Sequence, residues 1–151
     1  MINIILDEKP SSISIRYNAY YKLVILLSII NHCAYSKKAD LNLIHLVFWS
    51  LRDEKNYKIL LDLANQNRKT LVPWSFEYGI DQVLALGYIN DFLERKIVSG
   101  TLEIKITNTG LAILKSIDNL ELFTQEIEKI KALGKIPKKR LQEANKNWKL
   151  I

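Results

Sequence analysis

A β-hairpin signal inside an otherwise helical chain constrains the fold more than any other feature of this sequence. Residues 101–107 alternate between apolar and polar side chains, as a strand does when one of its faces is buried. The strand-rich run 88–98 precedes them, and the dipeptide Ser99-Gly100 between the two runs is typical of a tight hairpin turn. The predicted inward residues are Leu102, Ile104 and Ile106. We therefore expect a two-stranded hairpin, with Gly87 ending the helix before it.

Helical periodicity dominates the rest of the chain, because apolar residues recur there at spacings of three and four. The predicted helices span residues 19–34, 41–51, 56–65, 75–86, 109–117, 119–133 and 138–148. The predicted capping residues are Asn18, Asp40, Ser75 and either Thr107 or Asn108. The segment 41–51 is apolar on two sides, so we expect other elements to pack against both of them.

This order of elements predicts an α+β fold that is mostly α: a winged-helix domain with a two-stranded wing and extra C-terminal helices. Three parts are expected, namely an N-terminal arm at 1–17, the winged-helix core at 18–118, and a C-terminal helical extension at 119–151 with a basic last helix. An unrelated α+β domain with one hairpin is the alternative.

The composition fits one globular domain outside the membrane. With 151 residues, 48% of them hydrophobic, the chain is long enough to bury a core without disulfides or metals. Cys33 is the only cysteine, which excludes an intrachain disulfide and favours a reducing compartment. The most apolar run, 23–30, is shorter than the roughly 20 residues that span a bilayer. We expect a cytoplasmic protein with neither a signal peptide nor a membrane segment.

The sequence contains no recognisable catalytic or cofactor-binding motif. The two histidines, His32 and His45, are not spaced as metal ligands, and no glycine-rich phosphate loop or nucleophile motif occurs. Asp53 and Glu54 are adjacent in a predicted turn and have no evident partner. We therefore predict that the protein is not an enzyme and that it has no catalytic residue, no cofactor and no metal.

The charges on the helix before the hairpin indicate whether a winged helix binds DNA or a protein. In DNA-binding proteins with related folds, a recognition helix enters the major groove between rows of phosphates. The predicted helix 75–86 contains Glu77 and Asp81 but no lysine or arginine, and unpaired carboxylates would be repelled there. Gln82 alone is weak evidence for base reading. We therefore predict that this helix faces a protein partner through Glu77 and Asp81.

The positive charge is concentrated near the C-terminal end. The net charge is +6, and the segment 135–151 supplies most of it. Basic residues there and at 68–69 are candidates for sequence-independent contacts with the phosphates of double-stranded DNA. The candidates are Arg68, Lys69, Lys135, Lys138, Lys139, Arg140 and Lys146. A solvated helix face, or a docking surface for an acidic partner, is the alternative.

The three tryptophans divide by their surroundings. Trp49 and Trp74 have apolar neighbours and are predicted core residues, which argues against their use as a stacking platform for single strands. Trp148 lies in the basic segment, so we expect it to be either an anchor onto the domain or an aromatic residue of a partner interface.

Several segments together resemble one protein family. The stretch 48–52 reads Phe-Trp-Ser-Leu-Arg, the stretch 87–89 reads Gly-Tyr-Ile, and the stretch 104–111 reads Ile-Lys-Ile-Thr-Asn-Thr-Gly-Leu. With its basic segment ending at Trp148, the chain resembles the small middle component of bacterial ABC-three-component systems over residues 18–148. That family includes the accessory subunits that accompany SMC-like ATPases, and the Lamassu defence systems are one group of it.

The resemblance implies a non-catalytic accessory subunit in antiphage or anti-plasmid defence. Such a subunit binds near the ATPase heads or the adjoining coiled coil and helps couple ATP state or DNA sensing to an effector subunit, usually a nuclease. The expected partners are the SMC-like ATPase and the effector, with non-specific double-stranded DNA as a further one. Because the signal Ile-Thr-x-x-Gly also occurs in transcription regulators, a winged-helix DNA-binding transcriptional regulator is the alternative.

Overall fold

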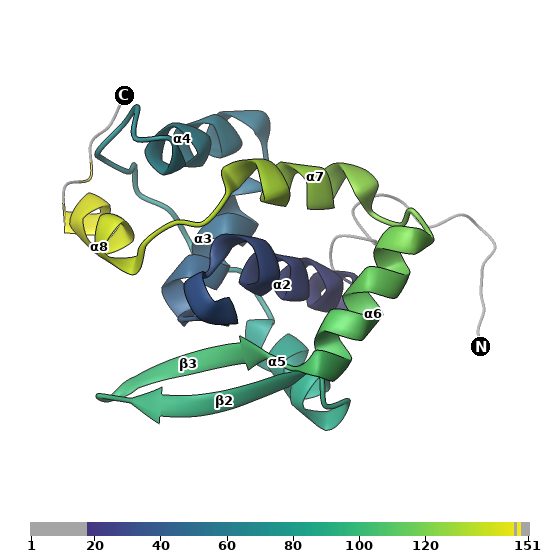
Figure 1. Ribbon diagram of the computed structural model, residues 1–151. Coiled ribbons are helices and arrows are strands. Elements are labelled where there is room, and N and C mark those ends of the chain that lie inside the picture. The colour runs from purple at the N-terminus through teal and green to yellow at the C-terminus, as the bar shows by residue number, and fades with distance from the viewer. Residues whose placement is uncertain (1–17, 147, 149–151) are drawn as a thin grey trace.

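The residues that the structure describes, 18–146 and 148, form a mostly helical α+β fold in this computed structural model (Figure 1). The helices in this part of the chain are α2 (Ala19–Cys33), α3 (Leu41–Ser50), α4 (Glu54–Ala64), α5 (Ile80–Ile89), α6 (Asn108–Asn119), α7 (Thr124–Leu133) and α8 (Lys138–Lys146), with a 3₁₀ turn, η1 (Tyr35–Lys37). The strands are β1 (Lys38–Ala39), β2 (Leu93–Val98) and β3 (Thr101–Ile106). The prediction of an α+β fold that is mostly α is confirmed.

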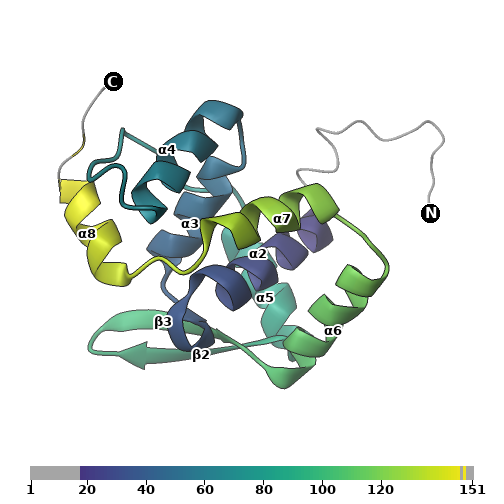
Figure 2. The same ribbon diagram turned by 45° about the horizontal axis from the view of Figure 1, so that its top comes forward.

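Helix α2 lies at the centre of the fold. Asn18 caps it, because its side-chain oxygen accepts hydrogen bonds from the backbone N–H groups of Tyr20 at 2.8 Å and Tyr21 at 3.1 Å. Helices α3, α5, α6 and α7 all contact α2, and Figure 2 shows α7 lying alongside it. Within the described residues, no helix has both the length and the apolar character needed to cross a bilayer.

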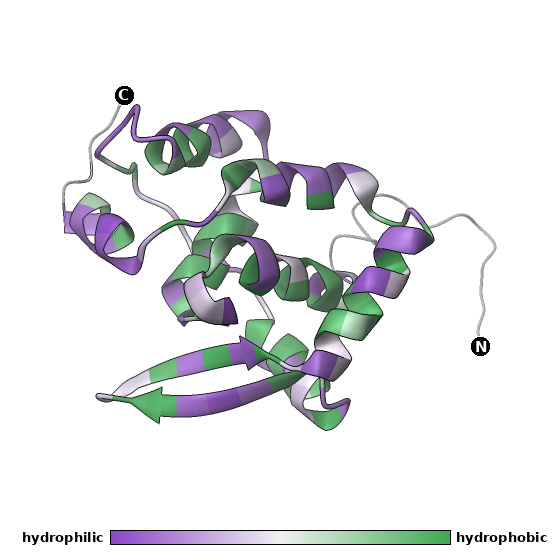
Figure 3. Ribbon diagram, viewed as in Figure 1, coloured by the Kyte–Doolittle hydropathy of each residue, from purple (hydrophilic) through white to green (hydrophobic). Residues whose placement is uncertain are grey.

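Helix α3 is buried along most of its length. Asp40 caps it as predicted, accepting a hydrogen bond from the Leu43 N–H at 3.0 Å. Every residue from Leu43 to Ser50 is buried, which confirms the prediction of packing on both sides. Apolar residues therefore gather in α2 and α3, at the middle of the molecule (Figure 3).

The three strands form one antiparallel sheet in the order β1-β3-β2. Val98 pairs with Thr101 across the hairpin turn, where Ser99 and Gly100 have φ values of 53° and 80°. Two left-handed residues in succession are what a two-residue hairpin turn of this kind requires. The predicted hairpin and its turn are therefore confirmed.

The inward face of the hairpin is also as predicted. Ile104 and Ile106 are buried and Leu102 is half-buried. Strand β2 begins at Leu93, because residues 88–89 of the predicted run 88–98 end α5 and residues 90–92 form a turn. Strand β1 was not predicted, because two residues are too few to show an alternating pattern.

Helix α5 starts later than the sequence indicates. It begins after Gly79, whose φ of 79° is left-handed, so the predicted helix 75–86 is wrong at its N-terminal end. Residues 65–79 are irregular instead. Side chains from α3 and from the turn after it bind the backbone of this segment, and those bonds outweigh its local helix preference.

Gly87 is not the helix stop that the sequence suggests. It lies inside α5, which ends two residues later with Asn90 as its cap. A Cβ atom at Gly87 would lie 2.3 Å from Cδ1 of Leu93. The glycine therefore allows close packing between α5 and the start of β2.

The predicted helix 119–133 is interrupted. Glu121 and Phe123 have left-handed φ values of 58° and 55°, and they separate α6 from α7. The Phe123 ring packs edge-on against Tyr21 of α2, with ring centroids 5.1 Å apart. Helix α7 thereby joins the core around α2, in which its Ile130 is fully buried.

The C-terminal helix begins close to the predicted place. Gly134, with φ of 67°, ends α7 as predicted, and Pro137 directly precedes α8. Helix α8 attaches to the core through buried Leu141 and Ala144. The predicted arm at 1–17 lies outside the described residues.

Candidate functional site

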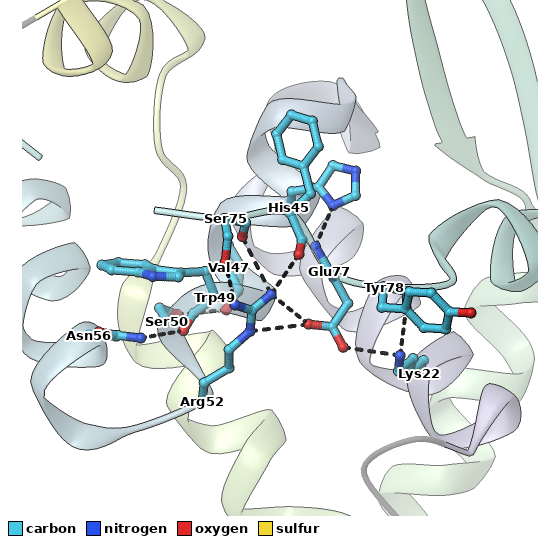
Figure 4. Close-up of polar contacts among 11 residues, drawn as sticks. Lys22, His45, Val47, Trp49, Ser50, Arg52, Asn56, Ser75, Glu77 and Tyr78 are labelled. Atoms are coloured by element: carbon cyan, nitrogen blue, oxygen red, sulfur yellow. Dashed lines mark hydrogen bonds and ion pairs between the residues drawn. The ribbon is translucent and has the colours of Figure 1, made fainter. Parts of the chain in front are cut away.

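Glu77 forms ion pairs with two basic side chains and so fixes the segment that precedes α5 in the chain (Figure 4). Its Oε2 lies 3.1 Å from Nζ of Lys22 on α2, and its Oε1 lies 3.2 Å from Nη2 of Arg52, which follows α3. The Lys22 and Glu77 side chains are only 4% and 11% exposed. We call Lys22, His45, Arg52 and Glu77 the Glu77 cluster. It ties two helices of the core to one loop.

Arg52 also holds the backbone of that loop. Its Nη1 donates to Oγ of Ser75 at 2.7 Å, and its Nη2 donates to the carbonyl oxygen of Phe76 at 2.8 Å. Lys22 adds a third fixed point, because its Nζ donates to the carbonyl oxygen of Tyr78 at 2.7 Å. Charge-assisted bonds of this kind are stronger than neutral ones. The segment 75–78 is therefore rigidly positioned.

His45 completes the Glu77 cluster from α3. Its Nδ1 accepts a hydrogen bond from the backbone N–H of Glu77 at 3.0 Å, so the neutral ring carries its proton on Nε2. The ring stacks on Phe76, with centroids 4.3 Å apart and planes 18° apart. Burial lowers the pKa of His45 below its usual 6.5, and Arg52 acts in the same direction, while Glu77 and Asp81 oppose the shift.

The lowered pKa of His45 predicts a dependence of stability on pH. Between the folded-state pKa and 6.5, the unfolded chain binds more protons at this site than the folded chain. The free energy of unfolding should therefore fall as the pH drops below about 6.5. Protonation also places a hydrogen on Nδ1, which then can no longer accept the hydrogen bond from the N–H of Glu77.

Urea denaturation between about pH 7.5 and about pH 5.5 measures this effect. His45→Asn is the matched variant, because the amide oxygen can accept the same bond and does not titrate. We expect its stability to fall less over this range than that of the wild type. His32, whose pKa burial also lowers, contributes equally to both proteins. An equal fall in both would contradict the assignment to His45.

The outer side of the same region is an exposed stripe. Tyr78 is 83% exposed and Ile89 is 80% exposed, and Asp81 and Ala85 lie exposed between them. Positions 81, 85 and 89 are four apart, so they follow one another along the outer surface of α5. We call Tyr78, Asp81, Ala85 and Ile89 the α5 face. It carries one negative charge and no positive one.

The structure separates the two acidic residues that were predicted to face a partner. Asp81 is exposed on the α5 face, as expected. Glu77 precedes the helix, and its carboxylate is directed inward to Lys22 and Arg52. Glu77 was expected on the outer surface because the helix was predicted to begin at Ser75. Its role in the structure is to position the loop.

The predicted basic residues gather in one region of the molecule. Arg140 of α8 donates to the carbonyl oxygen of Ala64 at the end of α4, at 3.0 Å. This bond holds α8 beside the chain that leaves α4 and continues into 68–69 (Figure 2). Two basic segments that are far apart in the sequence thus become neighbours.

The basic side chains differ in what they are free to contact. Arg68 and Arg140 are half-buried and donate to backbone carbonyls, Arg68 to that of Thr70 at 2.6 Å. The exposed ones are Lys69, Lys135, Lys138, Lys139 and Lys146. Lys138 lies 3.8 Å from Asp40, and Lys135 lies over the ring of Tyr35. The lysines, rather than the arginines, are therefore the surface charges available to an anionic partner.

Two tryptophans meet at α8. Nε1 of Trp74 and Nε1 of Trp148 both donate to Oδ1 of Asn145, at 2.8 Å and 3.2 Å. Trp74 is half-buried, whereas Trp49 is a core residue as predicted. Trp148 is 49% exposed. The Trp148 N–H is thus bound locally, to a residue three positions earlier, while much of its ring is exposed. A partner interface at Trp148 stays a prediction.

Sequence reasoning missed the residues that organise this region. Lys22 and Arg52 were not singled out, because only the fold brings them to Glu77. The one sequence signal for either residue was the position of Lys22, a charged residue immediately before the most apolar run of the chain. Ile89 was assigned to a strand, so its exposure on a helix was not foreseen.

The described residues offer no arrangement for metal binding, since no group of three or more histidine, cysteine, aspartate or glutamate side chains lies together in them. Cys33 is buried, and burial raises the pKa of its thiol to about 12, so it is not a reactive thiolate. No family model, no curated protein and no solved structure matches this chain.

Proposed function

We propose that this chain is a winged-helix interaction subunit that docks a partner protein on its α5 face. The observation that carries the proposal is the chemistry of that face, which is apolar and acidic where a DNA-reading helix would be basic. Exposed apolar residues in a row are typical of protein interfaces, and charged residues are depleted at interface centres.

The winged-helix assignment is supported by topology. Strand β1 lies between α2 and α3 in sequence, the β2–β3 hairpin follows α5, and β3 is the central strand. A winged helix has this order of a short strand and a hairpin around three helices. Helix α4 and the irregular segment 65–79 are additions between its second and third helices.

The partner that we propose is an SMC-like ATPase, with the chain acting as a non-catalytic accessory subunit in antiphage or anti-plasmid defence. This part of the proposal rests on the resemblance of residues 18–148 to the middle component of ABC-three-component systems. In such a complex the α5 face would contact the ATPase, and the subunit would help regulate an effector nuclease. The exposed lysines of α8 would supply any contact with duplex DNA.

Co-expression with the proteins encoded on either side, followed by affinity purification, tests this proposal. The wild-type chain should capture a large coiled-coil ATPase. Ile89→Asp should reduce the captured amount about tenfold or more, because it replaces the largest exposed aliphatic side chain of the α5 face with a charged one. Leu120→Asp is the matched control, since Leu120 is similarly exposed, at 69%, but lies at the end of α6.

Two results would overturn the docking proposal. One is a wild-type chain that captures no ATPase. The other is equal capture by Ile89→Asp and the wild type, which would move the interface away from the α5 face.

The alternative function is a winged-helix transcriptional regulator. The hairpin favours it weakly, because β2 and β3 carry Arg95, Lys96 and Lys105. Titration of labelled duplexes of different sequence at two salt concentrations distinguishes the two functions. Tight binding with a strong sequence preference would favour the regulator over the docking subunit.

A further inference from the structure

Three aromatic side chains from two distant segments lie together on one surface. Phe76 is 63% exposed, Trp148 is 49% exposed and Trp74 is half-buried. The rings of Trp74 and Phe76 have centroids 5.6 Å apart, and Asn145 joins Trp74 to Trp148 through their indole N–H groups. We call Trp74, Phe76 and Trp148 the aromatic shelf. Trp74 was predicted to be a core residue, so the sequence did not indicate this surface.

The shelf is held in place before any ligand arrives. His45 stacks against Phe76, and Arg52 binds the Phe76 carbonyl oxygen. The hydrogen bond to Asn145 fixes the Trp74 indole. Rings fixed in this way lose little conformational entropy when a second ring stacks on them.

The surface beside the shelf has a net positive charge, with the exposed Glu143 of α8 as a single acidic side chain between two lysines. Helix α8, which supplies Asn145 and leads to Trp148, exposes Lys139 and Lys146, which are two helical turns apart on one side. Figure 3 shows that most residues of α8 are hydrophilic. Lys69 is exposed in the loop that α8 holds beside α4. An extended anion could contact these charges while its flat groups reach the rings.

We propose that the aromatic shelf and the lysines of α8 bind single-stranded nucleic acid, with bases stacked on the rings and phosphates beside the lysines. Stacked rings next to a basic surface are the combination that binds single strands with little sequence preference. A duplex does not fit this combination, because its bases are already stacked within it and present only their edges. The inference is independent of the α5 face and of any ATPase partner.

Tryptophan fluorescence of the full chain, titrated with an oligothymidine of about 20 nucleotides, tests the proposal. Binding should quench Trp74 and Trp148, while Trp49, which is 5% exposed, remains as an unquenched background. Oligouridine of the same length tells whether the 2′-hydroxyl matters. Anisotropy of labelled oligonucleotides gives the affinity independently of the tryptophans.

Substitutions separate stacking from charge. Phe76→Ala and Trp148→Ala should each weaken binding roughly tenfold, and Phe76→Trp should keep it, since any aromatic face can stack. The double variant Lys139→Glu with Lys146→Glu should weaken binding and lower its salt dependence. Ile97→Ala is the matched control, because Ile97 is 73% exposed on the hairpin and should not contribute. Ile89→Asp should leave binding unchanged.

Several outcomes would overturn the proposal. Equal affinity for a duplex and a single strand, with no loss in Phe76→Ala and Trp148→Ala, would show that only phosphates are bound. Absence of quenching and of anisotropy change at low salt would exclude a nucleic-acid ligand. An equal loss in Phe76→Ala and in Phe76→Trp would mean that the position matters for a reason other than stacking.

Discussion

Glu77→Ala is expected to lower the free energy of unfolding by about 3 to 5 kcal/mol, which is a large share of the stability of a small domain. The substitution removes the carboxylate that lies between Lys22 and Arg52. Water reaches the Lys22 ammonium group poorly, because its side chain is only 4% exposed. Losing one member of a buried ion cluster costs more than the cluster contributes as a whole, since a charge stays behind in a poorly hydrated place.

Chemical denaturation of Glu77→Ala beside Glu54→Ala measures this cost. Glu54 also forms an ion pair, with Lys129, but its side chain is 81% exposed. An exposed pair of this kind contributes less than about 1 kcal/mol. The interpretation of Glu77 as a buried structural residue would be wrong if both variants lost the same amount.

The same variant should also loosen the loop that it fixes. The side chains of Lys22, His45 and Arg52 hold this loop, and the Glu77 carboxylate aligns two of them, Lys22 and Arg52. Amide hydrogen exchange at residues 74–79 should therefore speed up relative to the core helices. Unchanged exchange there would mean that the backbone bonds of Arg52 suffice without the carboxylate.

The second large effect is expected for Gly110→Ala, which should lower the free energy of unfolding by about 3 kcal/mol. A Cβ atom at Gly110 would lie 2.4 Å from the carbonyl oxygen of Phe92 and 2.8 Å from Cγ1 of Ile106. The first neighbour is backbone and cannot rotate away. It also accepts a hydrogen bond from the Thr107 N–H at 3.0 Å, so a shift would strain the bond that joins β2 to the start of α6. Overpacking of this kind exceeds the helix preference that alanine brings.

Thr109→Ala is the matched control for this position. Thr109 lies in the same turn of α6 and is exposed, so its substitution should change the free energy of unfolding by less than about 0.5 kcal/mol. Thermal or urea unfolding of both variants distinguishes a steric cost from a general effect on the helix. A Gly110→Ala variant as stable as the wild type would mean that α6 can move away from β2 at little cost.

Local patterns predicted the hairpin and most of the helices correctly. The alternation around Ile104 and the turn at Gly100 act over a few residues, and capping at Asn18 acts within one turn. Such interactions are present in any chain that contains these residues in this order, so they can be inferred without the fold.

Long-range contacts account for the errors. Segment 75–79 has a capping serine and an apolar pattern, but His45 and Arg52 bind its backbone from α3 and the turn after it. The break before α7 depends on Phe123 meeting Tyr21, which is about one hundred residues away. No local pattern contains the partner in either case.

The candidate sites likewise depend partly on local sequence and partly on long-range contacts. The absence of basic residues around Asp81 and the concentration of lysines after Gly134 are properties of the sequence alone, because charge does not depend on folding. The tertiary structure decided which groups are available: it turned Glu77 inward, engaged Arg140 with the end of α4, and joined Trp74 to Trp148 at Asn145. The physical reason is that burial and hydrogen bonding between distant segments fix where a side chain points, and those contacts exist only once the chain has folded.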